Sequence, residues 1–266
     1  NPEPFSEEED QAVALGIAAV PTNTGDSLYF GLAGANAVDD REVIAYFTQE
    51  REALLEYDIT EMIYKLSRSK LPKLGIMGSL SLQLGPGGPM AAMQGQLQPY
   101  VIYEQLSGAF DIEHVDLSAD RIGEDIDVLM IFHPADLSPQ ILYAVDQFVL
   151  RGGRILAFID PFSEMAQQSS PMGMQAPATN TSSSLDPLLE AWGVTFDATR
   201  VVGDRRRALR VQTGQAGNRP SSDYVVWLGL QNDGDVEDFD SADPITANLS
   251  LLQLGSAGAL LPIEEA

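Results

Sequence analysis

The sequence predicts an α/β fold in which helices flank a wound, mostly parallel sheet, with a small β-rich lead-in before it and a β-rich part after it. Two observations carry this prediction. Short apolar runs recur between helical segments at 74–78, 112–117, 128–133 and 155–160. The stretch 127–161 then places a strand, a well-capped helix and a second strand in succession, which is the unit that joins parallel strands.

The lead-in comes first. Residues 12–47 contain short apolar runs separated by turn residues, which are typical of small strands. Over 50–68 apolar side chains recur at helical spacing, which predicts an amphipathic helix; they are Leu55, Ile59, Met62, Ile63 and Leu66. We expect residues 1–70 to form this lead-in and its helix, and residues 71–266 to form the α/β domain.

Strands and helices alternate after Pro72. Residues 80–95 are rich in Gly, Pro, Gln and Met and are expected to form a long loop after the strand at 74–78. A helix is expected at 98–109, where Ile102, Leu106 and Ala109 lie on one side.

The stretch 127–161 has the clearest local signals. Ser138 suits a helix N-cap, and Pro139 suits the first helical position. Gly152 and Gly153 indicate the end of this helix. The apolar strand that follows ends at Asp160, so this stretch is expected to form a strand–helix–strand unit.

The last third of the chain is less regular. Residues 163–184 are of low complexity and are expected to form a mobile loop, followed by a short helix at 185–192. Residues 194–231 are predicted to be β-rich. An acidic stretch at 232–243 separates them from a final apolar segment at 245–261.

Composition excludes several classes of partner and site. There are 39 acidic and 15 basic residues, which gives a formal net charge of -24. This charge repels phosphate backbones and anionic membrane surfaces, so we expect no nucleic-acid partner. The chain has no cysteine, which excludes disulfides, thiol catalysis and cysteine-ligated metals.

Membrane and targeting signals are missing from the sequence itself. No apolar run approaches the roughly 20 residues that span a bilayer. Residues 1–10 are polar and acidic, unlike a signal peptide, and there is no initiator Met. We therefore expect a piece of a longer protein, whose anchoring segments lie outside this sequence.

The carboxyl ends of the parallel strands are the expected ligand site, because ligands bind there on open α/β sheets. The residues expected at this edge are Gly78, Ser79, His133, Pro134 and Asp160. A hydrolytic set of Ser79, His133 and Asp160 is conceivable, but the chain has no G-x-S-x-G motif to present the serine. We expect no catalytic residue, no metal and no cofactor.

Three other motifs have plain structural explanations. The glycine-rich segment 85–89 contains two prolines and no Gly-Lys-Ser/Thr, so it is interpreted as a loop and not a phosphate site. The acidic run 233–240 could ligate Ca²⁺, yet it lacks the EF-hand glycine and glutamate, and a solvated loop is favoured. The basic cluster of 205–207 and Arg210 is expected to pair with the acidic surface; the alternative is that it faces an anionic ligand or partner.

The order of these segments resembles the extracytoplasmic part of GldG-type proteins, which are auxiliary components of uncharacterised ABC transport systems named after the gliding-motility transporter. The stretch 126–161, IDVLMIFHPADLSPQILYAVDQFVLRGGRILAFIDP, is the most specific block. YVIYEQL at 100–106 and LLEAWGV at 188–194 add to it, as do VVGD and DPITANL further on. The opening of the chain is also similar.

The resemblance implies a fold like that of class I glutamine amidotransferases and flavodoxins, similar also to a domain of intraflagellar-transport proteins. It implies an anchored protein at the extracytoplasmic, periplasmic face of the bacterial inner membrane, working with an ABC permease and ATPase. Family members have no established catalytic residues, and this chain lacks the amidotransferase cysteine.

Three hypotheses for function follow. The first is a non-enzymatic auxiliary or binding domain of an ABC transport system, which binds a substrate, a glycan or a partner protein at the strand-end edge. The second is a hydrolase of small molecules or glycans that uses Ser79, His133 and Asp160. The third is Ca²⁺-assisted adhesion through residues 233–240.

Overall fold

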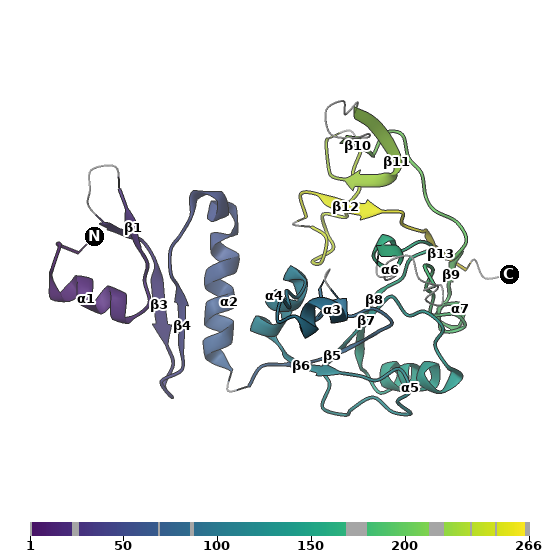
Figure 1. Cartoon of the computed structure of the whole chain (residues 1–266), viewed down its shortest axis with the longest axis horizontal. Helices are drawn as coiled ribbons and strands as arrows, with labels where there is room; N and C mark the ends of the chain where they lie inside the picture. Colours follow the sequence, from purple (N-terminus) through teal and green to yellow (C-terminus); the bar gives the residue numbers. More distant parts are fainter. Residues whose placement is uncertain are drawn as a thin grey trace. The chain divides into compact units, whose positions relative to one another are not determined.

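A computed structural model describes residues 2–22, 27–68, 70–85, 88–168, 180–212, 221–234, 236–247 and 249–263. The chain forms two compact units, residues 1–72 and 73–266, which are described separately below (Figure 1).

The first unit is β-rich, as expected, and packs two hairpins with two helices. Its elements in chain order are α1 (Glu7–Ala14), β1 (Ala19–Pro21), β2 (Ser27–Tyr29), β3 (Leu32–Ala35), β4 (Arg41–Ile44), the 3-10 helix η1 (Gln49–Leu54) and α2 (Leu55–Ser67). β1 pairs with β2 and β3 with β4, both antiparallel. Gly34 lets α2 approach β3, because a Cβ there would lie 2.8 Å from the Leu66 side chain.

Two elements of this unit differ from the sequence expectation. α1 was not predicted; its N-cap is Ser6, whose hydroxyl accepts a hydrogen bond from the Glu9 N–H, and its first turn is acidic. Acidic residues stabilise a helix N-terminus, but the first ten residues lack an apolar stripe that would have indicated the helix. The helix predicted over 50–68 begins as the tighter η1 and becomes α-helical at Leu55.

The second unit contains the predicted parallel sheet. Its strands are β5 (Lys73–Gly78), β6 (Asp111–His114), β7 (Val128–Phe132) and β8 (Arg154–Phe158), in the order β6-β5-β7-β8. All neighbouring pairs are parallel. The α/β prediction is therefore confirmed, although β6, β7 and β8 end one to three residues earlier than the apolar runs in the sequence.

Helices cover both faces of this sheet. The helices are α3 (Gly88–Met93), α4 (Val101–Ala109) and α5 (Pro139–Leu150). α3 lies within the stretch 80–95 that was expected to be a loop. α5 begins where predicted, with the Ser138 hydroxyl accepting from the Ile141 N–H and Pro139 at the first position. It ends before Gly152, which has the left-handed φ of 92° that glycine tolerates.

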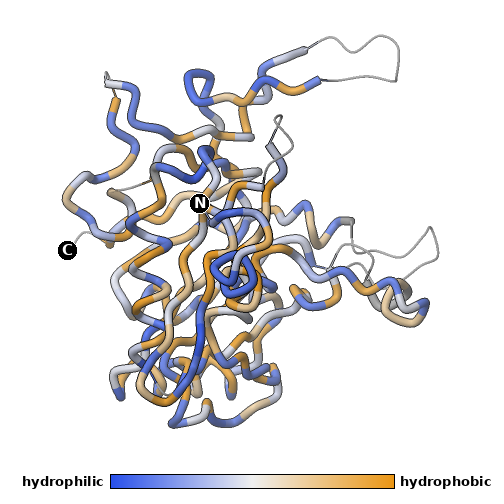
Figure 2. The backbone as a smooth tube through the Cα atoms, turned by 90° about the vertical axis from the view of Figure 1, so that its left-hand side faces the viewer, coloured by the Kyte–Doolittle hydropathy of each residue, from blue (hydrophilic) through white to orange (hydrophobic). Residues whose placement is uncertain are grey.

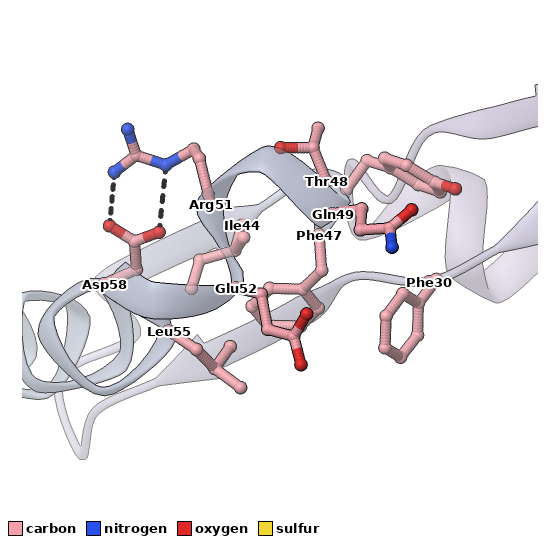
Figure 3. Close-up of a pocket in the computed structure, with 10 residues that line it drawn as sticks. Phe30, Ile44, Phe47, Thr48, Gln49, Arg51, Glu52, Leu55 and Asp58 are labelled. Carbon is pink, nitrogen blue, oxygen red and sulfur yellow. Dashed lines mark hydrogen bonds and ion pairs between the residues drawn. The ribbon is translucent and has the colours of Figure 1, made fainter.

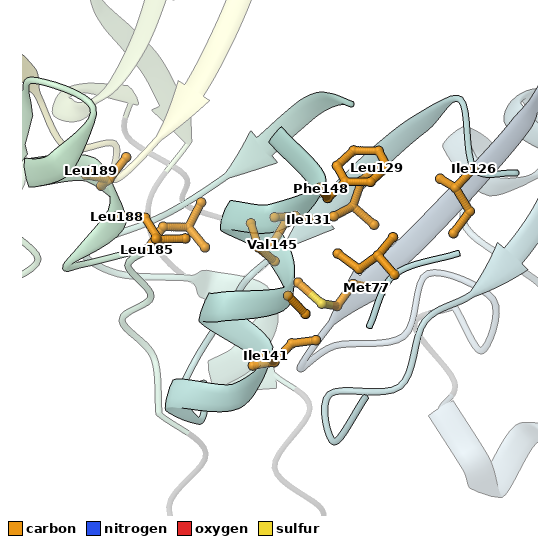
Figure 4. Packing of buried hydrophobic residues seen from close by; sticks show 12 residues of the cluster. Met77, Ile126, Leu129, Ile131, Ile141, Val145, Phe148, Leu185, Leu188 and Leu189 are labelled. Carbon is orange, nitrogen blue, oxygen red and sulfur yellow. The ribbon is translucent and has the colours of Figure 1, made fainter. Parts of the chain in front are cut away.

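The core has one cluster on each face of the sheet. On the α5 face, Val145 and Phe148 pack against Leu129 and Ile131 of β7 (Figure 4). On the other face, Ile76 and Met130 pack against residues of α4 and its flanks. Burying a side chain such as Phe148 stabilises a fold by roughly 1.5–3 kcal/mol, so these two layers hold the sheet in place.

The C-terminal part is β-rich, as predicted. It contains α6 (Glu164–Gln168), α7 (Leu188–Ala191), β9 (Val194–Phe196), β10 (Ala208–Gln212), β11 (Ser221–Leu230), β12 (Leu252–Gly255) and β13 (Leu260–Pro262). Strands β10, β11 and β12 form one antiparallel sheet, and β9 pairs with β13. The Glu164 carboxylate joins α6 to this sheet, because it accepts from Trp227 Nε1 at 2.6 Å and from Ser256 Oγ at 3.3 Å.

The stretch 163–184, where we expected a mobile loop, is partly described. It starts with α6, and residues 180–184 form hydrogen bonds near the sheet. Residues 169–179 lie outside the described part of the chain. Hydrophobic stretches along the backbone are short and alternate with hydrophilic ones (Figure 2), and none of the helices described here is long and apolar enough to cross a bilayer.

Candidate functional site

The strand order places a switch point between β5 and β7. In the strand order, β6 follows β5 along the chain and lies on the outer side of β5. β8 follows β7 and lies on the outer side of β7, so the two connections run in opposite directions. Connections that diverge in this way open a crevice at the carboxyl ends of the two strands, where ligands of wound α/β proteins bind. The residues that follow β5 and β7 are Ser79 and His133.

Gly78 and Ser79 tie the end of β5 to the end of β7. A Cβ on Gly78 would lie 1.9 Å from the Phe132 carbonyl oxygen, so only glycine fits there. The Ser79 N–H donates to the His133 carbonyl at 3.2 Å. The Ser79 hydroxyl donates to the Ala135 carbonyl at 3.0 Å and accepts from the Ala135 N–H at 3.1 Å. The Ser79 hydroxyl therefore holds the loop after β7 in place through two hydrogen bonds.

His133 is buried in a strained backbone conformation. Its side chain is 1% exposed and its φ is 49°, in the left-handed region. Nε2 lies 2.9 Å from the Asn180 carbonyl oxygen, which can only accept, so Nε2 carries the proton. Nδ1 is buried and has no hydrogen-bond partner within the described residues. A buried nitrogen without a hydrogen-bond partner destabilises the folded state, so His133 is a candidate functional residue.

Asp160 lies beside His133 at the end of β8. The Asp160 backbone forms two hydrogen bonds with Ser183: the Asp160 N–H donates to the side-chain Oγ of Ser183 at 2.9 Å, and the Ser183 N–H donates to the Asp160 carbonyl at 2.8 Å. Burial raises the pKa of the Asp160 carboxyl, and the electrostatic attraction of His133 opposes this rise. The carboxylate is thus held in a poorly solvated place.

A polar pocket of about 270 Å³ adjoins this edge. It is lined by Pro134, Ala135, Asp136, Leu137, Leu142, Asn180, Ser182, Ser183, Ser184, Asp186 and Ala198. Asn180 Nδ2 donates to Asp136 at 3.4 Å, and the Ser184 hydroxyl donates to Asp186 at 2.7 Å. The lining offers carboxylates, hydroxyls and an amide, which suit a ligand with hydroxyl or N–H groups.

The structure brings part of the expected site together. Gly78, Ser79, His133 and Pro134 are joined by the backbone contacts between β5 and β7, and Asp160 interacts electrostatically with His133. Of these five residues, only Pro134 lines the polar pocket. The sequence reasoning missed Asp136, Asn180 and the serines of 182–184. No sequence pattern indicated that Asn180, which is 47 residues from His133 in sequence, contacts it in the fold.

The geometry does not assemble a serine–histidine catalytic pair. Both hydrogen bonds of the Ser79 hydroxyl go to the Ala135 backbone, and Nε2 of His133 is directed at Asn180. A nucleophile needs its base within hydrogen-bond reach, and among the described residues no hydrogen bond joins these two side chains.

Two residues of the acidic run, Asp233 and Asp238, pair with Arg207. Arg207, with a side chain only 10% exposed, pairs with Asp233 at 2.7 Å and Asp238 at 2.8 Å. Asp238 also accepts from the Gln231 N–H. The expected pairing of the basic cluster thus occurs at Arg207. Asp235 lies outside the described residues, and within them no group of three or more His, Cys, Asp or Glu could hold a metal ion.

Comparison with known proteins gives one match. Residues 71–266 match the sequence model of a protein family described as an ABC-type uncharacterized transport system. No curated protein and no solved structure matches the chain. The matched range contains the parallel sheet, the edge with Ser79 and His133, and all of the C-terminal strands.

Proposed function

Because the chain belongs to the family described as an ABC-type uncharacterized transport system, we propose that it is a non-catalytic auxiliary component of such a system. The observation that carries this proposal is the family match, which spans 71–266 and thus the whole of the α/β unit. The Ser79 hydroxyl supports the non-catalytic part, since both of its hydrogen bonds go to the Ala135 backbone and, among the described residues, none joins it to His133.

The finer assignment is a GldG-like protein of the gliding-motility type. It rests on the resemblance of the 126–161 block, which corresponds to β7, α5 and β8. In this assignment the chain lies at the extracytoplasmic face of the inner membrane and is anchored there. Its partners are the permease and ATPase subunits of the same system.

The strand-end edge is the proposed binding surface for a glycan, a transported substrate or a peptide of a partner. The polar pocket supports this role because its serine hydroxyls and the Asp136 and Asp186 carboxylates can pair with hydroxyl and N–H groups. The same carboxylates, together with the net charge of -24, disfavour phosphate-bearing ligands.

Photo-crosslinking tests this binding surface. A photoreactive residue replaces Asp136, which is exposed and lines the pocket, in the membrane-bound protein expressed from its own gene. The matched control replaces Glu124, an exposed carboxylate before β7 and therefore at the opposite end of the sheet. We expect crosslinks to the permease or to a glycan from position 136 only. Equal crosslinking from both positions, or none from 136, would contradict the proposal.

The alternative function, a hydrolase at the same edge, retains one supporting observation. Burial raises the pKa of Asp160 beside the buried His133, and perturbed pairs of this kind occur in active sites. The contacts of Ser79 and His133 count against it, because a hydrolytic mechanism would first have to break both hydrogen bonds between the Ser79 hydroxyl and the Ala135 backbone. We therefore favour the binding role.

A further inference from the structure

The first unit contains a pocket that the family match does not include. It has a volume of about 430 Å³ and lies between the open end of the β3–β4 hairpin and the start of the η1–α2 helix (Figure 3). Its lining residues are Phe30, Ile44, Tyr46, Phe47, Thr48, Gln49, Arg51, Glu52, Leu55 and Asp58. The volume is in the range of small-molecule pockets, roughly 300–1,000 Å³.

Three aromatic rings form one wall of this pocket. The Phe30 ring meets the Phe47 ring at a centroid distance of 5.3 Å and the Tyr46 ring at 6.4 Å, both edge to face. Phe30 is nevertheless 57% exposed, which is unusual for a ring that is held in place. An exposed ring that lines a pocket leaves part of its surface available to a ligand.

The backbone holds these rings at fixed positions. The Phe47 N–H donates to the Phe30 carbonyl at 2.7 Å and so extends the pairing of β3 and β4. Gly31 makes this approach possible, because a Cβ there would lie 2.5 Å from the Ile44 carbonyl oxygen. The aromatic wall is therefore preformed, and ligand binding needs little ordering of the chain.

The charges of the pocket do not cancel. Arg51 and Asp58 form a bidentate pair, with Nε–Oδ2 at 3.1 Å and Nη2–Oδ1 at 2.5 Å. The hydrogen bond to Arg51 lowers the pKa of Asp58, so this pair stays ionised and neutral as a unit. Glu52 also lines the pocket, and within the described residues its carboxylate has no hydrogen bond or ion pair. Figure 3 shows Glu52 on a different side of the pocket from the Arg51–Asp58 pair.

We propose that this pocket binds a small organic cation, an ammonium group that carries apolar substituents. The faces of Phe30, Tyr46 and Phe47 are negative and attract a cation, and Glu52 supplies the countercharge. Neither alternative ligand class fits as well. An anion would be repelled by Glu52, and a neutral apolar ligand would desolvate that carboxylate without pairing it.

Titration with choline, a quaternary ammonium ion, tests the proposal on the whole chain. The matched neutral probe is 3,3-dimethylbutan-1-ol, which has the same shape with carbon in place of the charged nitrogen. We expect choline to shift the NMR signals of Phe30, Tyr46 and Phe47, and to bind at least about fivefold more tightly than the alcohol. Equal affinity for both probes, or no shift of these signals with choline, would overturn the proposal.

Two substitutions test the contributions of the carboxylate and of the aromatic rings to binding separately. Glu52→Gln and Phe30→Leu are each expected to weaken choline binding by about fivefold. Glu50→Gln is the control, since Glu50 is an exposed carboxylate of the same 3-10 helix and does not line the pocket. Circular dichroism confirms that each variant is folded. If Glu50→Gln weakens binding as much as Glu52→Gln does, only the general negative field attracts choline, and the site is refuted.

Discussion

At the end of β5, the size of one residue decides whether two strands can meet. Gly78 touches the Phe132 carbonyl so closely that a Cβ would lie 1.9 Å from the oxygen. The sequence placed Gly78 at the ligand edge. Its structural task, to let β5 approach β7, depends on a contact that no local pattern reveals.

Replacement of Gly78 by alanine is expected to destabilise the fold by about 1–3 kcal/mol or more, because β5 and β7 must move apart. The control is Gly108→Ala in α4, where an added Cβ meets nothing within 4 Å. That change is expected to stabilise the protein by about 0.5–1 kcal/mol, since alanine favours helices. Urea denaturation measures both. An unaffected Gly78→Ala variant would show that the sheet can absorb the added carbon.

Asp160 gives a pH prediction. Burial raises its pKa, so between the ordinary and the raised pKa the folded state binds more protons than the unfolded state. Its contribution therefore makes the free energy of unfolding fall as pH rises through that range. Asp160→Asn removes the buried charge, and we expect this variant to be more stable than the parent protein at pH 7. The gain should vanish below about pH 4, where the carboxyl is protonated.

The control for this experiment is Asp120→Asn, the same change of charge at an exposed residue, which accounts for the reduced net repulsion. Denaturant midpoints measured from pH 4 to pH 8 give the comparison. If Asp160→Asn lowers stability at pH 7, the attraction between Asp160 and His133 outweighs the cost of burial, and our description of this pair is wrong.

At the scale of elements, local signals predicted α5, α4 and α7, but not α1 or α3. Ser138, Pro139 and Gly152 are cap residues whose effect is confined to neighbouring residues, so the sequence alone contains the information. α1 and α3 lack that combination of cap and apolar stripe, and tertiary contacts decide whether such segments are helical.

Ser138→Ala is expected to cost about 1 kcal/mol of stability, because the Ile141 N–H loses its acceptor. Ser107→Ala is the matched control within a helix, where the exposed hydroxyl bonds only to the Glu104 carbonyl one turn earlier. This second change is expected to stay within about 0.5 kcal/mol. Equal effects of the two substitutions in chemical denaturation would argue against a capping role for Ser138.

The Arg207 pairs connect the start of β10 to the acidic loop, through Asp233 and Asp238. A double-mutant cycle of Arg207→Met and Asp238→Asn is expected to give a coupling free energy of about 1–3 kcal/mol, since both side chains are largely buried. Arg206→Met, at the exposed neighbouring position, is expected to change stability by less than about 0.5 kcal/mol. A coupling close to zero in the cycle would mean that the pair is replaced by water.

At the scale of the whole molecule, the fold class followed from the alternation of apolar strands and helical segments. The strand order did not, because a strand's neighbours are set by crossovers and not by its own residues. That order is what brings the ends of β5 and β7 together at the switch point. The pocket at Asp136 and Asn180 was missed because its walls come from segments distant in sequence. The aromatic pocket of the first unit is lined by Phe30 and by residues within 44–58, and it was missed because no sequence pattern showed that this segment folds back against Phe30.

The central claim is that this protein works as an auxiliary component of an ABC transport system. Reciprocal affinity purification from membranes solubilised in a mild detergent tests it directly, with the tag first on this protein and then on the ABC permease of the same cell. We predict that each tagged protein recovers the other, together with the ATPase, in a constant ratio. If the permease and ATPase recover each other from the same membranes and this protein is absent from both preparations, the claim is contradicted.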